Sequence, residues 1–85
     1  MITGMQIRMA RQALRWSVSY LSDQSGISTS TIKRIEALDG IPISTKANIL
    51  AIRTALESAG IEFTGTPEHR PGVCINISKK IASTS

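Results

Sequence analysis

The chain has 85 residues, with ten Lys and Arg against six Asp and Glu, and its net charge of +4 and pI near 9.9 favour polyanionic partners. Its length suits one domain with a modest core, and the absence of an apolar run of roughly 18 residues excludes a membrane span. Basic residues interrupt the apolar ones at the N-terminus, unlike a signal peptide, and a single cysteine excludes an intramolecular disulfide, so a cytoplasmic location is expected.

The first predicted helix covers residues 4–15. Its start fits a capping box, in which the Thr3 hydroxyl accepts from the Gln6 amide and the Gln6 side chain reaches back to the Thr3 amide. Apolar residues then recur at steps of three and four, at Ile7, Ala10 and Leu14. This pattern predicts an amphipathic helix.

Two short helices are predicted next, over residues 18–25 and 29–38. Ser17 and Ser28 are the expected N-caps, and Gly26 between the helices can adopt the left-handed conformation that ends a helix. Three apolar pairs have the spacing of a hydrophobic staple at successive helix starts: Ile2 with Ile7, Trp16 with Leu21, and Ile27 with Ile32. These signals predict a helix–turn–helix.

A fourth helix is predicted after Pro42, which cannot lie in a helix interior. Ser44 or Thr45 can cap this helix, and Gly60 marks its end. The residues expected to form its buried stripe are Ile49, Ile52, Leu56 and Ala59.

Beyond residue 60 the period of the apolar residues changes from helical to alternating. Residues 61–64 and 73–78 are predicted to be the strands of a β hairpin, joined by the turn-rich loop GTPEHRPG. The chain therefore divides into a helical region at 1–60, a hairpin at 61–78 that could serve dimerisation, and a flexible tail at 79–85.

The stretch WSVSYLSDQSGISTSTIKRIE resembles the helix–turn–helix of the Xre/Cro-type, phage-repressor-like regulators, and the similarity covers roughly residues 2–64. It rests on residues that match in type: Ser17, Leu21, Gly26, Ile27 and Ile32. The resemblance implies a mostly α, lambda-repressor-like bundle of four to five helices, here followed by the β hairpin. It also implies an ion pair between Arg11 and Glu36, and duplex DNA binding by a homodimer with the third helix in the major groove.

The geometry of the third predicted helix leads to the same expectation, that this helix enters the DNA major groove. Ile32, Ile35 and Glu36 fall on its inward side, which leaves the outward side for base contacts by Thr29, Ser30, Lys33 and Arg34. The expected phosphate contacts are Ser17 and Ser28 at the helix starts, together with Arg11. Each of these residues also has a purely structural interpretation: the hydroxyls suit a first helical turn, and Lys33 and Arg34 could simply be solvated.

Some positions depart from the family pattern. Val18 stands where many relatives carry a glutamine, and short hydroxyl side chains replace longer ones at the start of the third helix. Base discrimination is therefore expected to be weak or to depend on DNA shape. Trp16 is expected to pack at a helix junction, and Arg8, Arg15 and Lys46 to lie on a solvated face.

No enzyme, cofactor or metal site is predicted. His69 is a lone histidine in the predicted turn, and Cys74 is expected to be a small, partly buried residue on a strand. The chain has no phosphate loop, no paired zinc motif and no base placed beside a nucleophile.

The sequence thus predicts a small transcriptional regulator, with repression as the expected mode, that binds duplex DNA sequence-specifically. The alternative is a protein-interaction module, such as an antitoxin or adaptor, in which DNA binding is secondary or lost. That alternative uses the hairpin, whose sheet edges can pair with a second copy or with a protein partner.

Overall fold

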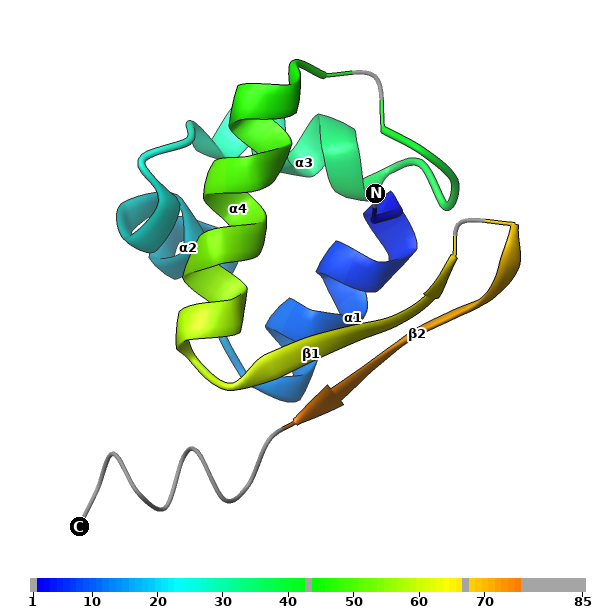
Figure 1. Ribbon diagram of the computed structural model, residues 1–85. Coiled ribbons are helices and arrows are strands. Elements are labelled where there is room, and N and C mark those ends of the chain that lie inside the picture. The colour runs from blue at the N-terminus through cyan, green and yellow to red at the C-terminus, as the bar shows by residue number, and fades with distance from the viewer. Residues whose placement is uncertain (1, 43, 67, 76–85) are drawn as a thin grey trace, which may run out of the picture.

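A computed structural model of the chain describes residues 2–42, 44–66 and 68–75. These residues form four helices and a two-stranded antiparallel sheet (Figure 1). In chain order the elements are α1 (Gly4–Ala13), α2 (Val18–Ser25), α3 (Thr29–Glu36), α4 (Lys46–Ser58), β1 (Ile61–Thr66) and β2 (His69–Ile75). The predicted mostly helical fold with a C-terminal hairpin is confirmed for this part of the chain. None of these helices is long and apolar enough to cross a bilayer.

Side-chain caps begin all four helices, as the sequence predicted. Thr3 and Gln6 form the complete capping box of α1, and the hydroxyls of Ser17, Ser28 and Thr45 accept the amide three residues on at the starts of α2, α3 and α4. Because each of these bonds is local in sequence, the helix starts agree with the predictions.

Two helices end earlier than predicted. α1 stops at Ala13 because Arg15 has a left-handed backbone (φ 57°), and the Trp16 amide closes the turn on the Arg11 carbonyl at 3.0 Å. α3 stops at Glu36, and Ala37 caps it. A residue other than glycine at the left-handed position is why the sequence did not signal the first of these ends.

The core lies between the four helices. The fully buried side chains include Ile7, Leu21 and Ile32, one from each staple pair, together with Ile35, Ile52 and Leu56. Ile49 and Ala59, expected in the buried stripe of α4, are only half-buried.

The hairpin strands are longer toward their turn than predicted. Gly65 (φ 72°) allows an irregularity in the ladder between Thr64 and Thr66, and pairing resumes at Thr66 with His69. His69 therefore lies on β2 rather than in a turn, and Cys74 is exposed rather than partly buried. The predicted continuation of the strand to residue 78 and the tail at 79–85 lie outside the described residues.

The hairpin packs against the helices, and β1 contacts α4 while β2 contacts α1. The buried Gln6 side chain connects the two parts, since its Nε2 donates to the Thr64 carbonyl at 2.9 Å and to the Gly72 carbonyl at 2.8 Å. Gln6, which completes the capping box of α1, thus also donates hydrogen bonds to both strands.

Candidate nucleic-acid interface

The turn between α2 and α3 is fixed by glycine and serine. Gly26 has φ 75°, and its amide donates to the Ser22 carbonyl at 2.8 Å. The Ser22 hydroxyl donates to the Ile27 carbonyl at 2.6 Å, and the Ile27 amide donates to the Ser25 hydroxyl at 3.2 Å. The backbone groups that a tight turn leaves unpaired are therefore satisfied by neighbouring side chains, which sets the direction in which α3 leaves α2.

The inward side of α3 packs against α1 and α2. Ile32 and Ile35 are fully buried, and Glu36 is 6% exposed. Two nitrogens of Arg11 pair with the two Glu36 carboxylate oxygens at 2.8 Å each, and its Nη1 donates to the Trp16 carbonyl at 3.0 Å. The hydrogen bond to Glu36 raises the pKa of Arg11, and the attraction between the two charges adds to it against the opposing effect of burial.

The C-terminal end of α3 is held by the first turns of α1. The Gly4 amide donates to the Gly40 carbonyl at 2.9 Å, and a methyl group on Gly4 would collide with the carbonyl oxygens of Ile35 and Leu38. Arg8 donates to the Glu36 carbonyl at 2.6 Å and to the Asp39 carboxylate at 2.8 Å. Cationic donors suit the carbonyl end of a helix, so Arg8 stabilises α3.

The outward side of α3 carries the four predicted base-contact residues together. Thr29, Ser30, Lys33 and Arg34 are all exposed. Within the described part of the chain, neither Lys33 nor Arg34 forms an ion pair. The inward side of this eight-residue helix is therefore buried and bonded to α1, whereas the charged and hydroxyl groups of its outward side are accessible to a ligand.

The predicted phosphate contacts are placed differently from one another. Ser17 and Ser28 are exposed at the starts of α2 and α3, where their hydroxyls accept from the amides of Tyr20 and Thr31. The side chain of Arg11 is only 15% exposed and is directed to Glu36 and to the Trp16 carbonyl. The Arg11 side chain of α1 thus lies against the inward side of α3, away from the exposed side.

An aromatic pair lies beside the start of α2. Trp16 is half-buried against the core, and its ring meets Tyr20 in an edge-to-face arrangement with centroids 4.8 Å apart. Tyr20 is 46% exposed. Tyr20 is not among the residues predicted from the sequence, although its four-residue spacing from Trp16 across the helix start is a signal for such a contact.

Family models, curated proteins and solved structures were compared with this chain, and none of them matches it.

Proposed function

We propose that this chain binds duplex DNA through α3, as a small transcriptional regulator of the kind that its helix–turn–helix resembles, and that it does so as a homodimer. The observation that carries the proposal is that α3 has two different sides. Its inward side is buried and is bonded to Arg11 of α1 through Glu36. Its outward side exposes Thr29, Ser30, Lys33 and Arg34 to solvent. Rigid placement of exposed donors is what a DNA-reading helix requires.

The size and chemistry of α3 fit the major groove. An α-helix with its side chains is about 10–12 Å in diameter, close to the roughly 12 Å width of that groove. Arg34 could bond to both acceptors on a guanine edge, and the hydroxyls of Thr29 and Ser30 could bond to several bases. Thr29 and Ser30 in the first turn, and Lys33 and Arg34 in the last turn, would therefore contribute the base contacts.

Phosphate contacts would come from the helix starts. The exposed caps Ser17 and Ser28 place backbone amides and a positive helix end toward solvent at α2 and α3. With a net charge of +4, affinity should rest largely on contacts to the DNA backbone and should fall steeply as salt rises. In a two-fold dimer, the two copies of α3 would address half-sites about 34 Å apart or a multiple of that distance.

The test is a titration of the purified chain against random and genomic duplex fragments at two salt concentrations, followed by sequencing of the retained DNA. The proposal predicts salt-sensitive enrichment of a two-fold symmetric motif. Absence of binding at low salt would refute it.

Two arginine variants sharpen the test. Arg34→Ala should weaken binding to the enriched motif more than to random DNA. Arg8→Ala removes the same charge behind the exposed side of α3, where Arg8 contacts Glu36 and Asp39, and should leave the sequence preference unchanged. Equal losses on both DNAs for Arg34→Ala would contradict its role in reading bases.

The second candidate function is protein interaction through the hairpin, in the manner of an antitoxin or adaptor. It is favoured by the two-stranded sheet, in which each strand has only one partner among the described residues, and by Ile75, which is 38% exposed at the end of β2. In that case Ile75→Lys should abolish the complex with the partner, whereas Arg34→Ala should not. The alternating pattern of the second strand predicts Ile77 as a further residue of such a contact, but it lies outside the described residues.

A further inference from the structure

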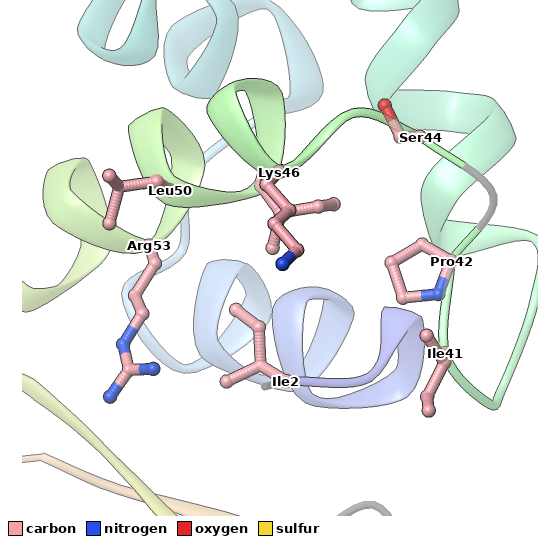
Figure 2. A pocket seen from close by; sticks show the side chains of 8 residues that line it. Ile2, Ile41, Pro42, Ser44, Lys46, Leu50 and Arg53 are labelled. Carbon is pink, nitrogen blue, oxygen red and sulfur yellow. The ribbon is translucent and has the colours of Figure 1, made fainter.

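A pocket of about 270 Å³ opens beside α4, between the segment that follows α3 and the start of α1. Its lining is mainly apolar and comes from Ile2, Ile41, Pro42, Ile49 and Leu50. Ile41 is 49% exposed and Leu50 62% exposed, so two large apolar side chains stand in water at its rim. Figure 2 shows Ile41 and Leu50 on opposite sides of the pocket, with Ile2 below.

The charged groups of this pocket are both cations. Lys46 is exposed at the first position of α4, and Figure 2 shows its ammonium group between Leu50 on one side and Pro42 on the other. Arg53 also lines the pocket, although its Nε donates to Glu57 at 3.1 Å and its guanidinium lies 5.8 Å from the centre of the Phe63 ring. Among the described residues, no carboxylate lines this pocket.

A ligand that complements the charge of this pocket would therefore carry an anionic group. The ammonium group of Lys46 would pair with it, and the positive end of the α4 dipole lies at the same position. The apolar walls require that the rest of the ligand be hydrocarbon, because a polar body there would lose its hydrogen bonds to water.

Size limits the ligand further. A cavity of about 150 Å³ holds a benzene molecule. A pocket of about 270 Å³ therefore has room for a body of about eight to ten carbon atoms.

We propose that this pocket binds a medium-length alkyl carboxylate, with the hydrocarbon chain between Ile41 and Leu50 and the carboxylate paired with Lys46. The site does not depend on DNA binding and lies apart from the exposed side of α3. A second copy of the chain is a poorer occupant, because pairing through this same face would bring the cations of both copies together.

The proposal can be tested by NMR titration of the ¹⁵N-labelled full chain with octanoate, below the concentration at which octanoate forms micelles. Saturable shifts are expected at the amides of Ile41 and of residues 44–50. n-Octylammonium has the same chain with the opposite charge and should bind at least tenfold more weakly. Acetate has the same head group without the chain and should give no saturable shift.

Two charge-reversal variants separate pairing at Lys46 from the general charge of the protein. Lys46→Glu should weaken octanoate binding at least tenfold and strengthen octylammonium binding. This variant should stay folded, because Lys46 is exposed and an acidic residue suits the first turn of a helix. Arg70→Glu makes the same charge change at an exposed position of the hairpin and should leave octanoate binding unchanged.

Leu50→Ala provides an independent check, because it removes one apolar wall at a position that is already exposed, and it should weaken octanoate binding without affecting the fold. Three results would overturn the proposal. Equal binding of octanoate and octylammonium would show that charge plays no part. Absence of saturable shifts would show that no such site exists. Shifts of the same amides with protein concentration alone would show that a second copy covers the pocket.

Discussion

The two sides of α3 differ in burial, in charge and in the partners of their charged groups. On the side facing α1, apolar groups are buried and the one carboxylate is paired at 2.8 Å to two nitrogens of Arg11. On the opposite side, hydroxyl and cationic groups are exposed, and the cations have no ion-pair partner within the described residues. The residues that hold α3 in place are therefore different from those that it exposes, so the stability of the fold and the proposed DNA binding can be changed separately.

The largest expected loss of stability comes from breaking the Arg11–Glu36 pair. The two side chains are 15% and 7% exposed, so either single replacement, Arg11→Met or Glu36→Leu, leaves a mostly buried charge without its partner. Each should cost about 3–5 kcal/mol in the free energy of unfolding. For a domain whose total is about 5–15 kcal/mol, that is a large share.

Urea denaturation of the two single variants and the double variant measures this effect. The double variant should lose less than the sum of the single losses, because it leaves no charge behind. Asp39→Asn is the matched control, since the Asp39 side chain is 76% exposed and its pair with Arg8 should contribute about 0–1 kcal/mol. Additive losses would show that the two charges do not depend on each other.

A smaller loss is expected at the contact between α1 and the end of α3. Gly4→Ala would place a methyl group against the backbone carbonyls of Ile35 and Leu38, which cannot move without shifting α3. We expect a cost of about 2–3 kcal/mol, measured as a lower midpoint in thermal and urea unfolding. Gly40→Ala is the control, because open space surrounds that position, and it should be tolerated. Similar effects of the two substitutions would contradict the close contact.

Loss of the side-chain donor that binds the hairpin should lower the free energy of unfolding by at least about 2 kcal/mol. At a pH where the new side chain is ionised, Gln6→Glu replaces the amide nitrogen that donates to the Thr64 and Gly72 carbonyls with a carboxylate oxygen, which accepts but cannot donate. Amide hydrogen exchange in β1 and β2 should accelerate more than exchange in α2 and α3. The exposed Gln12→Glu makes the same chemical change on α1 and should leave exchange in the hairpin as it was. Unchanged protection of the strands in Gln6→Glu would show that apolar contacts alone hold them.

Local signals in the sequence were sufficient for the order of the elements and the starts of the helices, but not for the contacts between elements. The caps at Ser17, Ser28 and Thr45 bond to an amide three residues away, and the starts of the helices follow from them. The bonds from Gln6 to the hairpin join residues 58 and 66 positions apart, and the collision that Gly4 avoids depends on how α1 meets α3. No periodicity of the chain reports on such contacts.

The same limit applies to the candidate interface. The helical period correctly placed Ile32, Ile35 and Glu36 on the inward side and Thr29, Ser30, Lys33 and Arg34 on the outward side. The double role of Arg8 at the end of α3 was missed, because its partners Glu36 and Asp39 lie 28 and 31 residues away. The ends of the strands at the hairpin turn were also predicted wrongly. An irregularity in the ladder at Gly65 allows Thr66 and His69, which were predicted to lie in the loop, to pair.

The most direct test compares the stability and the DNA binding of one variant on the outward side of α3. Lys33→Ala with Arg34→Ala removes two exposed charges without an ion-pair partner in the described part of the chain, so the free energy of unfolding should change by no more than about 0.5 kcal/mol. Affinity for duplex DNA at low salt should fall at least tenfold in the same preparation. Unchanged DNA affinity, or a loss of DNA binding that accompanies unfolding, would contradict the division of α3 into a structural side and a DNA-binding side.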